Sequence, residues 1–427
     1  MKNFIDLFAG IGGFRRGMEM NDLECVLSCE LNESARLSYS VIHNEKFDDI
    51  LLDVNNFDKI KKRLSNVKVD IICGGFPCQP FSRSGKREGF KDKNKGSLFF
   101  STMKIVNFLK PQTIILENVK GLLSIGEVIA TEDDEPNIEV DKGSTFKDIL
   151  FELDNAGYNV EWQVINSAHF CSQKRERVFI HAELKSNIFK SIFPLPSMKP
   201  SLIKVSSKVA IKDFINELLI GTGPNGDSLV SKSDTLKVYK LNDRQMYYED
   251  GSNFIYSRVH PFNNWGIMIN STIYTTKINH KLPDKYEYKL SDILLSDDEI
   301  AKKYSSEILS NEDVEKQKHS KSAKVWKTGN KMGRMSFPDR IDKPSRTLTA
   351  QATGRELMVI EYIHNGKRKY RKLTDLEYLR LQGFNDCDYK KMVEAGVSKN
   401  QIKKQAGNAV TVNVINEIGR RLRKEIK

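Results

Sequence analysis

The sequence has no Cys-x-x-Cys pair among its six cysteines, and no histidine stands at metal-ligand spacing from any of them. Structural zinc sites use such closely spaced thiolates and imidazoles, so we expect no metal site. The cysteines are scattered along 427 residues, which indicates a reducing compartment. They stand at positions 25, 29, 73, 78, 171 and 387.

Long apolar runs are also missing from the chain. No stretch approaches the roughly 20 apolar residues that a transmembrane helix needs. The first ten residues, MKNFIDLFAG, lack the basic, apolar and small-residue order of a signal peptide. No internal repeat or low-complexity tract is present. We therefore expect a cytoplasmic protein without a membrane partner.

Negative charge is the scarcer sign, and the formal net charge is +12. The excess is concentrated in residues 321–372, which hold 14 Lys and Arg against 4 Asp and Glu, whereas residues 291–315 hold 8 acids and 2 bases. A positive excess of this size favours a polyanion or an anionic surface as partner. The basic stretch can follow a phosphate backbone. A lysine-rich solvated face is the alternative.

A chain of this length is expected to form two lobes. Its first part alternates short apolar runs with helical patterns, which predicts an α/β domain with a doubly wound, mainly parallel sheet over 1–185. We expect helices at 95–109 and 145–156, and an exposed acidic loop at 131–141. The expected strands are Phe4–Phe8, Cys25–Glu30, Val69–Gly74, Thr113–Asn118, Asn159–Ser167 and Arg177–Leu184.

The composition changes after Ile192, where the proline-rich run FPLPSMKP begins. Lys, Asn, Ser and Tyr then dominate without clear periodicity, so residues 186–370 are predicted to form a smaller, less regular inserted domain. Helical spacing returns at 373–384, within a predicted hinge over 371–404. An apolar helical face follows at 410–426.

A glycine-rich turn follows the first predicted strand directly, in DLFAGIGGF at residues 6–14. Glycines at a strand–turn–helix junction let the backbone approach a nucleotide-like ligand. Glu30 ends the next strand, twenty residues after Gly10, where its carboxylate can accept from ribose hydroxyls. Asp53 can accept from an adenine amino group. The alternative is a tight βα turn with two surface acids.

A cysteine between two prolines follows the third predicted strand, in GGFPCQPFS at residues 74–82. Cys78 lies at the carboxyl end of that strand, where open α/β sheets bind ligands. Pro77 has a fixed φ and restricts the backbone of Phe76, so we expect the thiol of Cys78 to have a fixed orientation. Basic residues in the following loop, 83–95, favour the nucleophilic thiolate. A structural turn is the alternative.

These two motifs, with ENV at 117–119, QKRER at 173–177 and QAGNAV at 405–410, resemble in order the signature motifs of the DNA (cytosine-5)-methyltransferase family. The resemblance covers roughly residues 1–185 and 330–427. Residues 336–349 resemble the motif that supports the family's target-recognition region. Two positions depart from the family pattern: Ser172 stands where proline is frequent, and Ala409 where serine is frequent.

The resemblance implies a Rossmann-like, S-adenosyl-L-methionine-dependent methyltransferase in which Cys78 attacks C6 of cytosine and activates C5. Glu117 would act at N3, Arg177 would lie near the cytosine carbonyl oxygen, and Arg175 near a phosphate or the catalytic loop. Without the resemblance, Glu117 can instead cap a helix, and the basic run can be a solvated strand end. The cofactor residues that it implies are Phe8, Gly10, Ile11, Gly13, Glu30, Asp53, Pro77 and Asn408.

The resemblance also implies how the chain is used. Residues 405–427 would complete the catalytic domain, and the inserted domain would be a target-recognition domain whose residues 190–335 read bases. The partner would be double-stranded DNA with its cytosine flipped out of the stack. We expect a monomer that pairs functionally, without physical contact, with a restriction endonuclease.

Three other functions fit parts of the sequence. The first is an RNA cytosine-5 methyltransferase on the same fold, against which the long variable region speaks. The second is a catalytically inert DNA-binding relative, against which the intact Cys78, Glu117, Arg175 and Arg177 speak. The third is a nicotinamide-dependent oxidoreductase, which explains the glycine-rich turn and Glu30 but neither PCQP nor QKRER.

Overall fold

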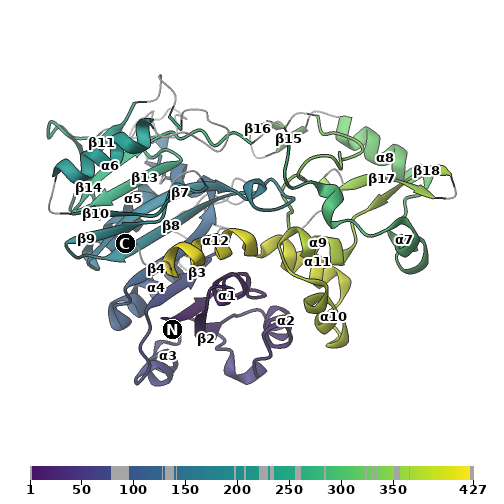
Figure 1. Ribbon diagram of the computed structural model, residues 1–427, viewed down its shortest axis with the longest axis horizontal. Coiled ribbons are helices and arrows are strands. Elements are labelled where there is room, and N and C mark those ends of the chain that lie inside the picture. The colour runs from purple at the N-terminus through teal and green to yellow at the C-terminus, as the bar shows by residue number, and fades with distance from the viewer. Residues whose placement is uncertain are drawn as a thin grey trace.

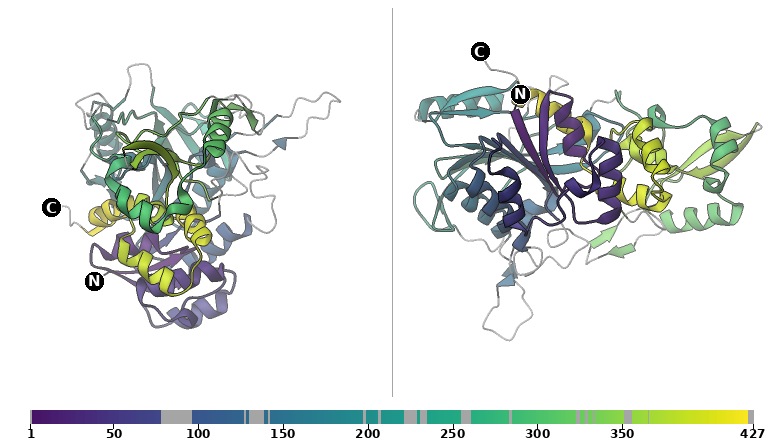
Figure 2. Two further views of the ribbon diagram at one scale, coloured as in Figure 1. Left: turned by 90° about the vertical axis from the view of Figure 1, so that its right-hand side faces the viewer. Right: turned by 90° about the horizontal axis from the view of Figure 1, so that it is seen from below.

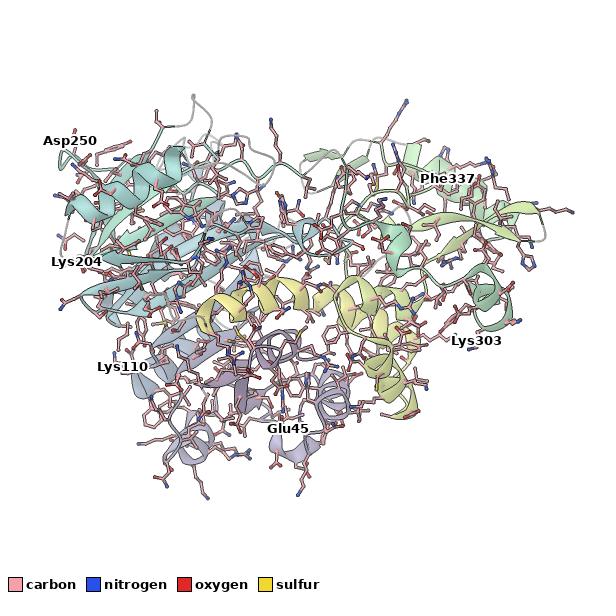
Figure 3. The ribbon with its side chains drawn as sticks, viewed as in Figure 1. Glu45, Lys110, Lys204, Asp250, Lys303 and Phe337 are labelled. Atoms are coloured by element: carbon pink, nitrogen blue, oxygen red, sulfur yellow. The ribbon has the colours of Figure 1, made fainter. Side chains whose placement is uncertain are left out.

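The chain forms a body around one large sheet and a smaller lobe beside it, as the computed structural model in Figure 1 shows. The smaller lobe carries Lys303 and Phe337, and the body carries Lys110, Lys204 and Asp250 (Figure 3). The structure describes residues 2–77, 96–126, 128–129, 139–140, 142–196, 199–205, 208–220, 229–230, 235–254, 261–282, 285–322, 325–327, 330–332, 334–350, 356–364 and 366–423.

The large sheet has ten strands in the order β12-β11-β14-β13-β7-β8-β4-β3-β1-β2. Strands β2, β1, β3 and β4 pair in parallel, and the remaining neighbours pair antiparallel. The parallel strands are β1 (Lys2–Leu7), β2 (Leu23–Cys29), β3 (Ile71–Gly74) and β4 (Thr113–Val119). The antiparallel strands are β7 (Tyr158–Asn166), β8 (Glu176–Leu184), β11 (Lys237–Asn242), β12 (Gln245–Tyr248), β13 (Trp265–Ile269) and β14 (Thr272–Thr276).

Helices cover both faces of the parallel half. Side chains of a strand point alternately to opposite faces, so Ile5 packs into the cluster that contains residues of α3, α4 and α5, while Phe4 packs into the cluster with α1 and α12. The predicted α/β, doubly wound fold is therefore confirmed. The helices are α1 (Gly13–Glu19), α2 (Glu33–His43), α3 (Phe57–Leu64), α4 (Gly96–Leu109), α5 (Ser144–Asn155) and α12 (Val412–Arg423).

The six strands predicted in the first 185 residues are all present, and no strand end differs by more than two residues. The predicted helices at 95–109 and 145–156 correspond to α4 and α5. The predicted acidic loop lies mostly outside the described residues. Only β6 (Glu139–Val140), paired with β5 (Val128–Ile129), is described there.

The sheet crosses the predicted boundary between residues 185 and 186. β13 pairs with β7, with Trp265 opposite Gln163, and β14, β11 and β12 extend the sheet further. Sequence reasoning missed β13 because WGIMI is buried at every position, so it has no alternation of polar and apolar residues. The same region holds β9 (Ile188–Ser191), β10 (Ser201–Lys204) and α6 (Lys208–Ile220).

The smaller lobe combines two antiparallel strand pairs, of which the β17–β18 hairpin is the longer, with short helices. Arg371 of β18 and Glu377 of α9 form a buried ion pair that ties the hairpin to the helices. Its elements are α7 (Asp297–Lys303), α8 (Asn311–Ser322), β15 (Val325–Lys327), β16 (Asn330–Met332), β17 (Val359–His364), β18 (Lys367–Lys372), α9 (Asp375–Leu381), α10 (Asp386–Glu394) and α11 (Lys399–Asn408). The 3-10 turns of the chain are Phe47–Asp49, Lys120–Ser124, Ser167–His169, Leu290–Ile293 and Ser305–Glu307.

The C-terminal helix α12 returns to the body and packs against α1 (Figure 2). A Cβ atom at Gly17 of α1 would lie 2.6 Å from the Cβ atom of Ile415, so the absence of a side chain at Gly17 allows the close helix contact. Across the described residues, none of the helices is both long enough and apolar enough to span a bilayer.

Candidate active site

One edge of the sheet collects the predicted site residues. The four parallel strands all end at this edge, where open α/β sheets bind ligands. A parallel bridge between Cys29 and Leu51 brings the segment that precedes Asp53 to the same edge. Because β8 is antiparallel to β4, it begins here with Glu176.

The glycine-rich loop turns between β1 and α1 at this edge. Phe8 and Gly10 both have φ of 57°, in the left-handed region, and Ile11 is buried. A Cβ atom at Gly13 would lie 2.6 Å from the carbonyl oxygen of Val410. Only glycine lets the C-terminal segment come this close to the loop.

Glu30 lies against the loop. Its Oε2 atom accepts a hydrogen bond of 2.8 Å from the backbone N–H of Gly10, and its Oε1 atom accepts one of 2.7 Å from Asn32. A carboxylate has about four lone-pair positions, so further acceptor capacity is left for ligand hydroxyls. Asp53, at the neighbouring position of the edge, accepts a bond of 2.9 Å from the N–H of Asn55.

Two apolar side chains beside these acids were missed by sequence reasoning. Leu31 is 67% exposed and Leu52 is 51% exposed, and they adjoin Glu30 and Asp53 in the sequence. They leave apolar surface exposed next to the two carboxylates. A large apolar residue directly next to a strand-end carboxylate is the signal that would have identified them.

The C-terminal segment closes the same region. Gln405 is buried, donates from Nε2 to the hydroxyl of Ser34 at 3.0 Å, and accepts from the hydroxyl of Ser38 at 2.8 Å. These two hydrogen bonds connect α11 to α2. Asn408, the last residue of α11, has an exposed side chain, and the following Ala409 is buried.

Cys78 lies outside the described residues, which stop at Pro77 on this side of the loop. The backbone that leads to it is held by Asn118, whose Nδ2 donates to the carbonyl oxygen of Phe76 at 3.2 Å. The Phe76 ring is buried, with its centroid 5.7 Å from that of Phe99. Asn118 is thus a third residue of this region that sequence reasoning missed, although it is the middle residue of the ENV motif.

Glu117 lies beside this segment and faces Arg177. The Nε atom of Arg177 is 3.1 Å from Oε1 of Glu117, whose side chain is 14% exposed. Burial raises the pKa of Glu117 above its ordinary value, and the positive charges of Arg177 and Arg175 oppose this rise. A Cβ atom at Gly75 would lie 3.5 Å from Oε2, so the carboxyl adjoins the segment before Cys78.

Arg175 has a different environment from the one expected. Its side chain is buried, and its terminal nitrogens donate to the carbonyl oxygens of Leu348 and Ala409, each at 3.1 Å. A buried guanidinium that donates to two carbonyls does not reach a phosphate in this structure. Arg175 instead joins the start of β8 to the segments that contain Leu348 and Ala409.

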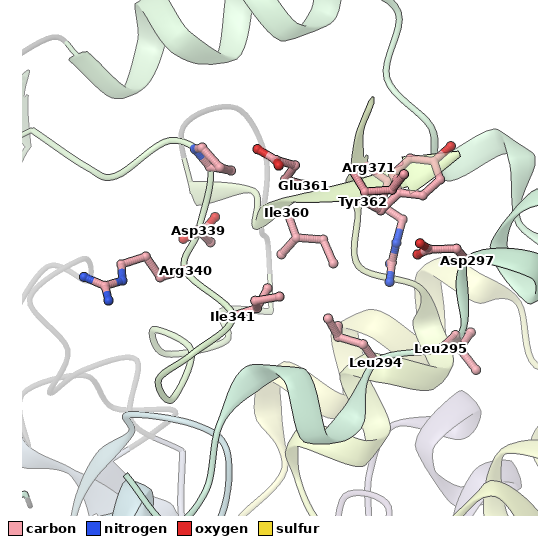
Figure 4. A pocket seen from close by; sticks show the side chains of 12 residues that line it. Leu294, Leu295, Asp297, Asp339, Arg340, Ile341, Ile360, Glu361, Tyr362 and Arg371 are labelled. Atoms are coloured by element: carbon pink, nitrogen blue, oxygen red, sulfur yellow. The ribbon is translucent and has the colours of Figure 1, made fainter. Parts of the chain in front are cut away.

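The described residues contain no group of three or more His, Cys, Asp or Glu side chains that could hold a metal. A pocket of about 420 Å³ opens in the smaller lobe between the α7 region and β17 (Figure 4). Its lining residues all fall between Leu294 and Arg371, so it contains none of the predicted site residues.

Several curated proteins resemble the chain. It is 36% identical over 196 residues to the Type II methyltransferase M.MspI of Moraxella sp, covering 46% of this chain and 41% of that protein. It is 37% identical over 244 residues to the Type II methyltransferase M.BsuFI of Bacillus subtilis, covering 56% and 51%. The chain thus spans about half the length of these relatives. The Orphan methyltransferase M.SPRI of Bacillus phage SPR is 25% identical over 461 residues, covering 98% and 96%.

Solved structures share the fold. The S. pombe Dnmt2 methyltransferase has a TM-score of 0.55 at 14% identity, with 98% of this chain and 97% of that chain covered. The Entamoeba histolytica methyltransferase EhMeth has a TM-score of 0.55 at 15% identity, with 99% and 98% covered. At these identities the likeness concerns the fold alone.

The match to a whole family extends over nearly the full chain. Residues 2–424 match the profile of the family described as C-5 cytosine-specific DNA methylase. This range contains both chain ends that meet at the sheet edge, together with the inserted region. The chain therefore belongs to the C-5 cytosine-specific DNA methylase family.

Proposed function

We propose that this protein transfers a methyl group from S-adenosyl-L-methionine to C5 of a cytosine flipped out of a specific short double-stranded DNA sequence. The observation that carries the proposal is the half-buried Glu117–Arg177 pair beside the segment that leads to Cys78. Membership of the family and the order of the motifs support it.

The residues at the sheet edge fit the chemical groups of the cofactor. Glu30 would accept from the ribose hydroxyls, because its contact with Gly10 fixes the carboxylate beside the glycine-rich loop. Asp53 would accept from the adenine amino group, with Leu31 and Leu52 against the ring faces. The loop backbone at Phe8, Gly10, Ile11 and Gly13, with Pro77 and Asn408, would enclose the remainder. When bound, S-adenosyl-L-methionine supplies the methyl group.

The protein's part in the chemistry is to make C5 nucleophilic. The thiolate sulfur of Cys78 forms a bond to C6, and the electrons of the C5–C6 double bond move into the ring toward C5 and N3. A protonated Glu117 donates to N3, which stabilises the charge that develops there. Burial favours that protonated form because it raises the pKa of the carboxyl. Arg177 donates to the cytosine carbonyl oxygen.

Release of the product breaks the bond between Cys78 and C6. Glu117 takes back the proton shared with N3, the proton on C5 leaves to water, its electron pair restores the C5–C6 double bond, and the sulfur of Cys78 departs as thiolate. Each step therefore needs Cys78 as nucleophile and then as leaving group. Arg175 acts differently, since its bonds to Leu348 and Ala409 make it a positioning residue.

DNA binding would use only part of the basic stretch 321–372. Lys321 pairs with Asp339, and Arg371 pairs with Glu377; both basic side chains are buried. These cations stabilise the smaller lobe, so phosphate contacts fall to exposed residues such as Lys367.

Base reading would fall to parts of 190–335 that are not built into the core. The side chains of β13 are all buried in the large sheet and cannot reach a groove. Exchange of residues 277–335 for the equivalent segment of a relative is expected to change which cytosine is methylated. Bisulfite mapping of plasmid DNA treated with the chimera measures this, and an active chimera that still marks the original sequence contradicts the assignment.

The substrate is tested by transfer of tritiated methyl groups to double-stranded DNA and to transfer RNA. The proposal expects label in DNA at C5 of cytosine within one short sequence, and none with Cys78→Ser. Label in RNA alone would favour the RNA cytosine-5 methyltransferase instead. The proposed pairing with a restriction endonuclease expects that methylated plasmid resists an endonuclease with the same target sequence.

A further inference from the structure

A histidine with no place in the proposed chemistry lies under the glycine-rich loop. His43 ends α2, and its ring is stacked at a tilt on Tyr39, with 4.5 Å between the centroids. Its Nε2 atom lies 3.2 Å from the carbonyl oxygen of Ile11. A carbonyl can only accept, so Nε2 carries the proton and donates to Ile11.

The imidazole is neutral in this position. Burial, together with the nearby cations Arg15, Arg16 and Lys391, lowers the pKa of His43 to about 3, and the bond to Ile11 opposes the shift. A neutral ring has one N–H, and the loop carbonyl takes it. The ring therefore stays neutral, with its single N–H on the loop carbonyl, at any pH well above its lowered pKa.

The bond fixes one peptide unit of the loop at both ends. The carbonyl of Ile11 accepts from His43, and the N–H of Gly12 in the same peptide donates to the carbonyl of Ala9 at 2.8 Å. The N–H of Gly10 is held by Glu30. The orientation of the Ile11–Gly12 peptide is thus set from α2, whereas that of Gly10 is set from the end of β2.

The ring also occupies the space that a side chain at position 12 would need. Gly12 has φ of 82°, and a Cβ atom built on it would overlap the imidazole of His43, 2.7 Å from Cδ2 and closer still to Nε2. Gly12 and His43 therefore form a matched pair in which the absent side chain makes room for the imidazole. A contact this close is relieved only by movement of the loop or of the ring.

We propose that His43 is a positioning residue of the cofactor site, which holds the Ile11–Gly12 peptide so that the loop backbone matches S-adenosyl-L-methionine. The proposal rests on the proposed function, because it assumes that the loop binds this cofactor. It adds a residue of α2 to a site otherwise built from strand ends and loops.

A matched pair of variants isolates the hydrogen bond. His43→Gln keeps an amide donor at similar reach, whereas His43→Met has nearly the same length and no donor. We expect the Kd for S-adenosylhomocysteine, measured by calorimetry, to rise about tenfold in H43M, the factor for one lost hydrogen bond, and to stay near wild type in H43Q. The exposed His319, replaced by Met, is the control for loss of a histidine.

A split between kinetic constants separates positioning from general damage. In H43M we expect KM for S-adenosyl-L-methionine to rise while kcat at saturating cofactor and the Kd for DNA stay close to wild type. Equal Kd values for H43M and H43Q would overturn the proposal. A wild-type chain that does not bind S-adenosylhomocysteine would instead count against the proposed function itself.

The contact between Gly12 and His43 offers an independent check. Gly12→Ala is expected to weaken S-adenosylhomocysteine binding by more than about tenfold, since it adds a clash to an unfavourable φ. The double variant G12A/H43A removes the clash, so it should bind more tightly than G12A alone. If the loss of binding free energy in the double variant equals the sum of the losses in G12A and H43A, the two positions are independent. That result would contradict the matched pair.

Discussion

Arg177 and Glu117 face each other across strands β4 and β8, with Nε 3.1 Å from Oε1. They are diagonal neighbours, because the residue directly opposite Arg177 is Val119. Because β8 runs antiparallel to β4, it brings the guanidinium of Arg177 to the edge where the parallel strands end. A carboxyl with a raised pKa and a guanidinium are thereby fixed beside the segment that leads to Cys78.

Glu117→Gln removes the titrating proton and keeps the shape of the side chain. We expect the single-turnover methylation rate to fall by about 10²-fold or more, while the Kd for DNA changes little. The wild-type rate should also fall as pH rises through the raised pKa of Glu117, and the variant should lack this decline. Quenched-flow measurements across pH check both, and an unchanged rate in E117Q removes Glu117 from the mechanism.

Arg175→Ala is expected to lower the stability of the fold more than it lowers the methylation rate. It leaves the carbonyls of Leu348 and Ala409 without their buried donor, so the free energy of unfolding should fall by about 3 kcal/mol. Arg177→Ala, by contrast, should lower the methylation rate with a smaller effect on unfolding. Urea denaturation of the two variants makes the comparison. A stable R175A that loses only DNA affinity would restore the phosphate contact first expected for Arg175.

The strand-end residues were predictable from the sequence because chain order decides where they lie. Glu30 follows β2, Asp53 follows the parallel bridge at Leu51, and Glu117 lies near the end of β4, so their shared edge follows from local pattern alone. The environment of Arg175 was not predictable, since its partners stand 173 and 234 residues away. Periodicity in the sequence indicates which face of a strand or helix a residue lies on. It does not indicate which distant carbonyl oxygen the side chain will contact.

The extent of the sheet was harder to predict than its first half. The strands up to β8 have local signals, whereas β11 to β14 join by long-range antiparallel pairing after a proline-rich break. The contact of His43 with Gly12 was also hidden, because it depends on how α2 packs under the loop. Tertiary packing, which local sequence does not encode, accounts for these omissions.

His181 predicts a pH dependence of stability in the sheet. Its Nδ1 lies 2.8 Å from Glu161 and its Nε2 3.2 Å from Glu183, and these carboxylates raise its pKa to about 9 against the effect of burial. A raised pKa gives a contribution that is full below the ordinary value of about 6.5 and is lost as pH rises through about 9.

The change that tests this is His181→Gln. Wild type should lose about 3 kcal/mol more than the variant between about pH 6.5 and pH 10, since a glutamine side chain has no such proton to lose. Arg421 lies near Glu161 and Lys190 lies near Glu183, and both cations are the same in wild type and variant, so the comparison isolates His181. Chemical denaturation at several pH values measures the slopes, and parallel slopes would contradict the charged imidazole.

Glu377→Gln should loosen the smaller lobe. Glu377 accepts two hydrogen bonds of 2.8 Å from Arg371, and both side chains are buried. Loss of one buried charge leaves the other uncompensated, so the free energy of unfolding should fall by about 3–5 kcal/mol. Glu361→Gln is the matched control, because its pair with the exposed Arg368 should contribute about 1 kcal/mol or less. Equal losses in the two variants would contradict the account.

The covalent bond between Cys78 and cytosine C6 is the central claim, and DNA with 5-fluorocytosine at the target position tests it most directly. Departure of the cysteine requires that C5 lose a proton. A fluorine atom in that place cannot leave as a cation, so the cysteine stays bound and the adduct accumulates. Wild type, incubated with S-adenosyl-L-methionine and this DNA, should give a complex that survives denaturing electrophoresis and carries the DNA on the peptide that contains Cys78. Cys78→Ser should bind the same DNA and give no such complex. A wild-type enzyme that methylates ordinary DNA but forms no adduct, or an adduct that persists in C78S, would contradict the mechanism.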